Sequence, residues 1–153
     1  MKTYSTKKSD IKREWHLVDA SDQILGRVAT RIASLLMGKQ KPIFARNMDT
    51  GDFVVVINAA KVRVTGDKAK QKMYYHHSGY PGALKVASYE KLMATHPTRV
   101  MEHAVKGMLP HTRLGAQMLK KLRIFADDKH PYAGQIGPAK AATAATVATG
   151  EKA

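Results

Sequence analysis

The pattern of hydrophobic and polar positions predicts helices that alternate with strands. The clearest helix covers residues 24–38, where apolar side chains recur at the i, i+4, i+7 and i+8 positions of one helical stripe. These side chains are Val28, Ile32, Leu35 and Leu36. Gly38 follows as a helix-ending residue, and Arg27 and Arg31 share the polar side. The two arginines are either ordinary solvated residues or a pair that meets phosphate.

Three segments in the first half have the composition of strands. Residues 15–19 (WHLVD) form a short one, followed by a turn at residues 20–22. Residues 53–60 (FVVVINAA) are almost continuously apolar and rich in β-branched side chains, which is typical of a strand buried on both faces. Residues 61–65 (KVRVT) alternate polar and apolar, which predicts a strand with one solvent-exposed face after a tight connection at residues 58–60.

The second half predicts three helices and a last strand. Ser88 can cap a short helix that ends near Thr95. Pro97 suits the first turn of a helix that runs to about Lys106, with Gly107 ending it. A third helix at about residues 112–122 leads into a short strand at residues 123–125. Strands separated by helices predict a three-layer α/β sandwich.

Composition divides the chain into three regions. Residues 1–13 are polar and expected to be extended, and residues 14–137 are expected to form a single domain. Residues 138–153 consist mainly of alanine and threonine and are expected to be disordered, because they cannot bury enough surface to offset their ordering entropy. The absence of Cys excludes disulfides and thiolate zinc sites. No apolar run is long enough to cross a bilayer, and the first residues lack the apolar core of a secretory signal, so we expect a cytoplasmic protein.

Charge narrows the choice of partner. The chain holds 26 Lys and Arg against 12 Asp and Glu, a formal charge of +14. Self-repulsion on this scale predicts a polyanionic partner, and an anionic membrane surface is the weaker alternative. Residues 23–48 and residues 103–126 each hold five Lys or Arg and no acid. The positive charge is thus spread over the folded body, which favours contact with a large nucleic acid on several sides.

The stretch at residues 61–84 combines cations, aromatic rings and glycines. Its lysines include Lys68, Lys70 and Lys72, which can attract phosphates. The run at residues 74–82 (YYHHSGYPG) follows directly, and its rings offer faces on which unpaired bases can stack. In an extended segment, alternate rings would point to opposite sides, so half of them could serve the core. The alternative interpretation is a surface hairpin with solvated lysines.

Motifs for other chemistry are weak or absent in the sequence. No nucleotide-binding G-x-x-x-x-G-K-[ST] loop is present, and the G-x-x-G match at residues 79–82 contains a proline and is more typical of an ordinary turn. The seven histidines form no helical ligand pair, so we expect no metal and no other cofactor. Asp49 and Asp52 are interpreted as turn and capping groups. The sequence therefore gives little support to an enzyme or a small-molecule substrate.

Several ordered motifs carry a family resemblance. Residues 105–110 (VKGMLP) closely resemble a signature of large-subunit ribosomal protein thirteen, a universal ribosomal family. Residues 15–20, 25–27, 49–52, 57–59, 61–62, 64–66, 75–79, 121–123 and 126 resemble further family segments in the right order, whereas Ala60 departs from the family pattern. The resemblance covers about residues 13–135, is of the bacterial or organellar type, and implies an α/β/α sandwich around a four-stranded parallel sheet.

The resemblance also implies a function. It implies a structural constituent of the large ribosomal subunit that binds rRNA, contacts neighbouring ribosomal proteins and supports early assembly, with no catalytic activity. Regulatory binding of messenger RNA away from the ribosome is the alternative. An enzyme acting on a nucleotide is a third hypothesis, suggested only by the α/β layering. The residues expected to contact RNA are Arg27, Arg31, Lys39, Lys41, Lys68, Lys70, Lys72, Tyr75, His76, His77, Gly79, Tyr80, Gly82, Lys106, Arg113, Lys120 and Lys121.

Overall fold

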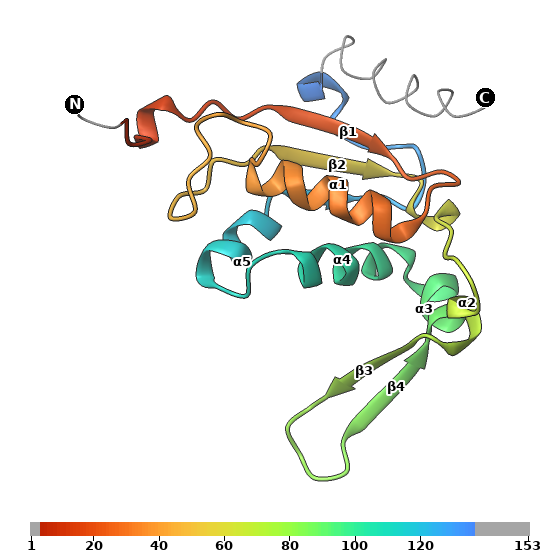
Figure 1. Cartoon of the computed structure of the whole chain (residues 1–153). Helices are drawn as coiled ribbons and strands as arrows, with labels where there is room; N and C mark the ends of the chain where they lie inside the picture. The colour runs from red at the N-terminus through yellow and green to blue at the C-terminus, as the bar shows by residue number, and fades with distance from the viewer. Residues whose placement is uncertain (1–3, 137–153) are drawn as a thin grey trace.

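A three-stranded parallel sheet forms the centre of the protein (Figure 1). The computed structural model describes residues 4–136. Strand β2 (Phe53–Ile57) lies between β1 (Trp15–Asp19) and β5 (Leu122–Ile124), and both pairings are parallel. Val54, Val55 and Val56 are fully buried, as expected for a strand covered on both faces.

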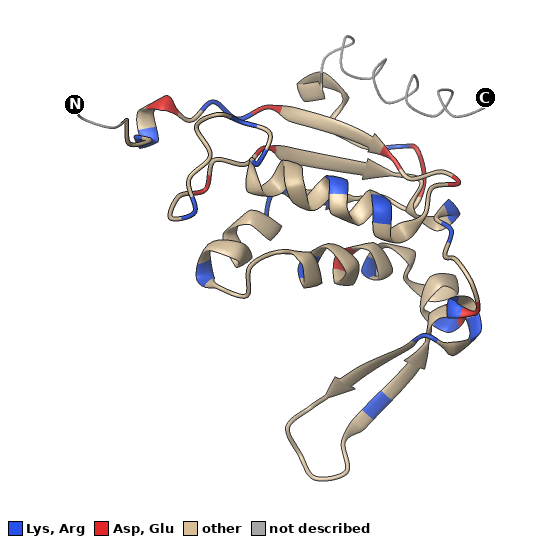
Figure 2. Cartoon of the chain, viewed as in Figure 1, with Lys and Arg blue, Asp and Glu red and all other residues tan. Residues whose placement is uncertain are grey.

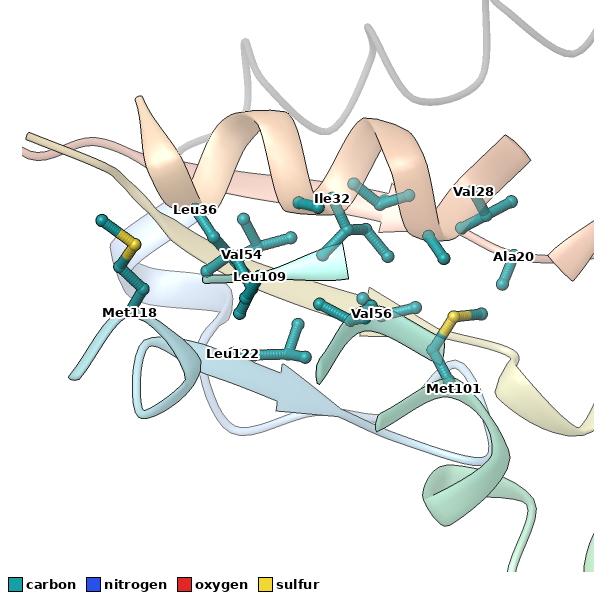
Figure 3. Close-up of a cluster of buried hydrophobic side chains, with 14 of the residues drawn as sticks. Ala20, Val28, Ile32, Leu36, Val54, Val56, Met101, Leu109, Met118 and Leu122 are labelled. Atoms are coloured by element: carbon teal, nitrogen blue, oxygen red, sulfur yellow. The ribbon is translucent and has the colours of Figure 1, made fainter. Parts of the chain in front are cut away.

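Helices cover one face of this sheet. Helix α1 (Leu25–Met37) and helix α4 (Pro97–Met108) lie side by side, and α5 (Arg113–Leu119) lies close by (Figure 1). Figure 3 shows the resulting core, in which side chains of α1 meet those of β2, α4, α5 and β5. Its labelled members are Ala20, Val28, Ile32, Leu36, Val54, Val56, Met101, Leu109, Met118 and Leu122. The outer side of α1 is left free for other contacts.

Aromatic side chains lie on the other face of the sheet. Trp15 stacks on its pairing neighbour Phe53 at 4.5 Å between ring centroids, and on Tyr132 at 5.3 Å. Because successive strand residues point to opposite faces, Phe53 lies on the side away from Val54 and the helices. The segment after β5 thus supplies cover for this face, with Ile136 also buried.

A two-stranded antiparallel hairpin extends away from the body (Figure 1). It consists of β3 (Met73–His77) and β4 (Leu84–Ser88). The short helix α2 (Lys68–Gln71) precedes it, and α3 (Tyr89–Thr95) follows, with the Ser88 hydroxyl accepting a hydrogen bond from the Lys91 amide. The hairpin therefore has its base between two helices and its tip far from the sheet.

The structure confirms most of the predicted elements. The first helix ends at Gly38, which adopts a left-handed conformation with φ 77°, and the strand at residues 15–19 occurs as predicted. The strand predicted at residues 53–60 occurs but ends earlier, at Ile57. Ser88 and Thr112 cap α3 and α5. Helix α4 continues through Gly107 to Met108, so the predicted end was slightly early.

The predicted four-stranded parallel sheet is wrong. Residues 61–65 do not join it, because η2 (Ala59–Lys61) turns the chain after β2. Only a single bridge forms, between Arg63 and Ile24 ahead of α1. Val62 is still buried, so the alternating pattern correctly reported the burial of one side chain but not the backbone pairing.

The N-terminal segment is not extended throughout. The N-terminal segment, expected to be extended, contains the short 3-10 helix η1 (Lys8–Asp10). The alanine- and threonine-rich tail at residues 138–153 lies outside the described residues. Within residues 4–136, no helix has the length and apolarity required to span a lipid bilayer.

Asp52, at the start of β2, is a buried anchor for β1. Its carboxylate forms an ion pair with Lys41 and accepts a hydrogen bond from the Glu14 amide at 2.9 Å. His16 Nε2 lies 3.1 Å away, and Gln40 Nε2 donates at 2.9 Å. Burial alone would raise the pKa of Asp52, but the hydrogen bonds from Lys41, the Glu14 amide and His16 outweigh it and lower the pKa below its usual value.

Asp49 makes the matching contact to the strand on the other side. It pairs with Lys121, which immediately precedes β5 and is itself buried. The Lys121 ammonium also donates to the Leu36 carbonyl oxygen at 3.3 Å, which ties it to the end of α1. Burial lowers the pKa of Lys121, against the opposing effect of its hydrogen bond with Asp49. The turn interpretation holds for Asp49, whose carboxylate accepts a hydrogen bond from the Gly51 amide at 3.3 Å. The contacts of Asp49 with Lys121 and of Asp52 with the segment before β1 add an anchoring role that the turn interpretation does not include.

We expect Asp49→Ala to lower the free energy of unfolding by about 3 kcal/mol, because Lys121 would be left buried without its carboxylate. Asp22→Ala is the matched control, since the Asp22–Arg63 pair is exposed and worth less than about 1 kcal/mol. Urea denaturation followed by Trp15 fluorescence measures both. Equal small losses in the two variants would contradict an anchoring role for Asp49.

Candidate nucleic-acid interface

Most of the residues expected to contact RNA have exposed side chains or backbone. The exposed ones are Arg27, Arg31, Lys39, Lys68, Lys70, Lys72, Tyr75, His76, His77, Gly79, Tyr80, Gly82, Lys106, Arg113 and Lys120. Figure 2 shows Lys and Arg recurring along α1, α4 and the region around α2, whereas many acids lie near the ends of β1 and β2. The protein thus directs its cations outward and keeps several acids near the sheet.

Two expected contact residues are placed elsewhere. Lys121 is only 6% exposed and pairs with Asp49, so its charge serves the fold. Lys41 is also partly buried; it pairs with Asp52 and donates to the Thr50 carbonyl oxygen at 3.2 Å. Both ammonium groups form ion pairs within the protein, and contact of these two residues with RNA stays a prediction.

The neighbouring helices α1 and α4 present one part of the basic surface. Their packing brings the Thr30 hydroxyl within 3.5 Å of the Met108 sulfur. Arg27 and Arg31 lie exposed on α1, and Lys106 lies exposed on α4. Since the buried stripe of α1 faces the sheet, its arginines are held on the opposite, solvent side by the geometry of the helix.

The base of the hairpin carries the second group of cations. Lys68 and Lys70 lie on α2, and Lys72 follows it directly. The Lys72 ammonium lies 5.7 Å from the ring centre of Tyr74, within range of a cation–π contact. Tyr74 in turn lies 5.7 Å from the ring of His103 on α4. This chain of contacts connects the hairpin base to the α4 surface.

The hairpin separates its side chains onto two faces, as the sequence predicted for an extended segment. Tyr75 is paired with Val86, and His77 with Leu84, so these four side chains share one face. Tyr75 is 68% exposed. Tyr74 lies on the other face and is the ring that reaches His103. Of the four rings of β3, only Tyr74 contacts the body of the protein, and Tyr75, His76 and His77 are exposed.

The glycines of the hairpin tip have a structural explanation. Gly79 and Gly82 both have positive φ values, 98° and 72°, which other residues rarely adopt. The Gly79 amide donates to His77 Nδ1 at 2.9 Å, and the turn leaves Tyr80 75% exposed. The G-x-x-G match is thus the turn of a hairpin, and Tyr80 is the side chain that the turn presents.

A cleft between α4, α5 and β5 brings together cations that lie apart in the sequence. It encloses about 650 Å³, and its lining includes Lys106 and Lys120. Arg123 and His111 also line it, although neither was among the expected contact residues. The sequence predicts only a strand at residues 123–125. Nothing in its local pattern indicates that Arg123 lines the same cleft as residues of α4. Lys39 and Arg113 do not line this cleft.

Exposed helical glycines are a further feature of this surface. A Cβ atom at Gly26 in α1 or at Gly107 in α4 would meet no atom within 4 Å. Glycine inside a helix costs about 0.5–1 kcal/mol relative to alanine, so the fold gains nothing from either one. Their bare backbone lies beside Arg27 and Lys106 in the sequence and is open to close approach from outside.

Within residues 4–136, the structure forms no cluster of three or more His, Cys, Asp or Glu suited to a metal ion. The arrangement instead combines separate exposed cations with exposed rings. Cations attract phosphates, and rings stack on unpaired bases. Its chemistry is therefore that of a nucleic-acid surface.

Comparison with known proteins identifies close relatives. Residues 13–131 match the family described as ribosomal protein L13. The chain is 58% identical over 135 residues to the large ribosomal subunit protein uL13 of Roseiflexus sp. (strain RS-1), covering 88% of this chain and 92% of that protein. The proteins of the same name from Herpetosiphon aurantiacus and Francisella tularensis subsp. novicida are each 57% identical over 88% of this chain, covering 94% and 95% of those proteins.

We expect Gly107→Ala to raise the free energy of unfolding by about 0.5–1 kcal/mol, because alanine favours the helix and the added methyl group meets nothing. Gly115→Ala is the matched control on α5. Its Cβ would lie 1.8 Å from the Pro110 carbonyl oxygen, so this variant should be destabilised. Urea denaturation of both variants measures the difference. A loss of stability in Gly107→Ala would show that the fold itself requires this glycine.

Proposed function

The chain belongs to the ribosomal protein L13 family, and we propose that it binds rRNA as a structural component of the large ribosomal subunit. We further propose that it supports early assembly of that subunit in the bacterial cytoplasm. Its partners would be large-subunit rRNA and neighbouring ribosomal proteins. The rRNA-binding unit would be the single domain at residues 14–137.

One observation carries the RNA-binding part of the proposal. The ion pairs among residues 4–136 use Arg13, Lys41, Arg63 and Lys121. None of these pairs involves the exposed cations of α1, α2, α4 or α5. A strongly positive protein that leaves these cations without acids is suited to a polyanion, since each one can replace a counterion on a phosphate.

The proposed mechanism is charge neutralisation at several separate places. Arg27 and Arg31 would meet phosphates along α1, while Lys68, Lys70 and Lys72 would do so at the base of the hairpin. These groups lie on different elements, so they could hold two RNA segments that would otherwise repel each other. The protein would act as a bridge that lowers the electrostatic cost of packing rRNA.

The hairpin would supply contacts of another kind. Tyr75, His76 and Tyr80 are exposed along the arm, and Tyr80 lies at its tip. Rings of this kind stack on unpaired bases, and such stacking is largely independent of sequence. Because the arm extends away from the sheet, it could reach between RNA segments that the body does not touch (Figure 1).

We expect an epitope-tagged copy of the chain to sediment with large ribosomal subunits in sucrose gradients, even after a high-salt wash. A protein that bridges buried RNA segments is held by many contacts at once, so salt should not release it. Tagged protein that moves to the free fraction in high salt would contradict a structural role. The control for adventitious binding is an unrelated RNA-binding protein of similar charge that is not part of the ribosome.

We expect Lys68→Ala/Lys70→Ala/Lys72→Ala to reduce the dependence of large-subunit rRNA binding on salt. The slope of log K against log salt should fall by about 0.7 to 0.9 for each phosphate that the variant no longer neutralises. The triple Lys→Arg variant keeps all three charges and is the matched control. Filter binding across a salt series measures the slope. An unchanged slope in the alanine variant would mean that these lysines remain hydrated in the complex.

A further inference from the structure

The cleft between α4, α5 and β5 has both an apolar floor and a cationic rim. Leu109 and Leu122 are only 4% and 7% exposed and belong to the main core, so this part of the floor is firmly supported. Leu119 and Ala116 complete it on the α5 side. A smaller cleft of about 230 Å³ shares Glu102, Leu119 and Leu122, and continues along the same edge of the protein.

The cations of the cleft come from three elements. Lys106 lies on α4, Lys120 follows α5, and Arg123 lies on β5. His111 lies on the rim as well, and Glu102 is the one acid in the lining. The charge of the cleft therefore favours an anion, and its apolar floor favours a flat, poorly hydrated group beside that anion.

The Arg123 guanidinium is held in position before any ligand arrives. Its Nη1 donates to the carbonyl oxygen of Lys120, a lining residue, at 3.1 Å, and its Nε donates at 3.2 Å to the hydroxyl of Tyr132, which lies on the aromatic face of the sheet and outside the cleft lining. A guanidinium oriented in this way loses less conformational freedom on binding than a free side chain does. Planar guanidinium groups are also well matched to phosphate oxygens.

We propose that this cleft binds one unpaired nucleotide of RNA. The base would lie against Leu109, Leu119 and Leu122, and its phosphate would meet Lys106, Lys120 and Arg123. The inference rests on the proposed function, because it names one site within the RNA-binding surface. A cleft of about 650 Å³ is within the range of small-ligand sites, and so is large enough for a nucleotide.

Charge and shape together favour a nucleotide over other occupants. A bare phosphate would satisfy the rim but leave the leucine floor in contact with water. An apolar peptide would cover the floor but leave several cations without partners, which costs free energy. An unpaired nucleotide joins an anion to a flat ring and can satisfy both parts of the cleft at once.

The test is a titration of the full chain, carrying ¹³C-labelled leucine methyl groups, with a single-stranded oligoadenylate about ten nucleotides long. Base ring currents should shift the methyl signals of Leu109, Leu119 and Leu122. An abasic oligonucleotide of the same length is the control, and it should leave these signals in place. Equal shifts with both ligands would overturn the proposal and leave only an anion site.

Two further outcomes separate this inference from the proposed function. If oligoadenylate binds and only signals outside the cleft move, the protein binds RNA but the cleft is not a nucleotide site. If neither oligoadenylate nor a large-subunit rRNA transcript binds at all, the RNA-binding function fails and this inference fails with it.

Substitutions of residues that line the cleft test whether the cleft itself binds the nucleotide. Ala116 lies exposed on α5, so Ala116→Leu should fill the cleft without unfolding the helix. We expect oligoadenylate affinity to fall about tenfold, as for loss of one stacked base. Ala94→Leu on α3 is the matched control and should change nothing. Glu102→Gln removes the one acid of the cleft and should strengthen binding. Unchanged affinity in both cleft variants would overturn the proposal.

Discussion

Two carboxylates just before β2, the buried Asp52 and the partly buried Asp49, connect this strand to its neighbours. Asp52 fixes the chain that leads into β1, and Asp49 fixes the lysine that precedes β5. The central strand is therefore connected to both of its neighbours through these two carboxylates and the groups that they contact. Because Lys121 also bonds to the end of α1, the same network sets the position of the helix whose outer side carries Arg27 and Arg31.

The protein uses its charges for two separate purposes. Acids near the sheet compensate a few buried or half-buried cations, and these pairs stabilise the fold. The remaining cations of α1, α2, α4 and α5 point to solvent and give the molecule its positive surface. The hairpin adds exposed rings at a distance from the core. The exposed cations of these helices take no part in the ion pairs near the sheet, so they can be substituted without removing those pairs.

Much of this fold was predictable because its signals are local. The stripe of α1, the apolar run of β2 and the capping residue Ser88 each depend on nearby positions. The failures involve partners far away in the sequence. Polar and apolar residues alternate over residues 61–65 as in a strand. This alternation does not show whether a neighbouring strand is available to form hydrogen bonds with it. Lys121 looked like a surface cation because its carboxylate lies 72 residues away. The exposure of the hairpin rings could be expected, whereas the cleft beside Arg123 required the packing of α4 against β5.

The parallel order of the sheet has a consequence for biosynthesis. Strand β2, whose three central residues are buried, pairs with β1 and β5, but β5 is made long after β1 and β2. During translation, the edge of β2 that pairs with β5 therefore has no hydrogen-bond partner until the last third of the polypeptide has left the exit tunnel. The carboxylate of Asp49 lacks its ion-pair partner Lys121 during the same interval. The first half of the nascent chain therefore cannot form the complete core by itself. Until β5 has been synthesised, β2 exposes an unpaired strand edge, to which chaperones can bind and with which other chains can pair.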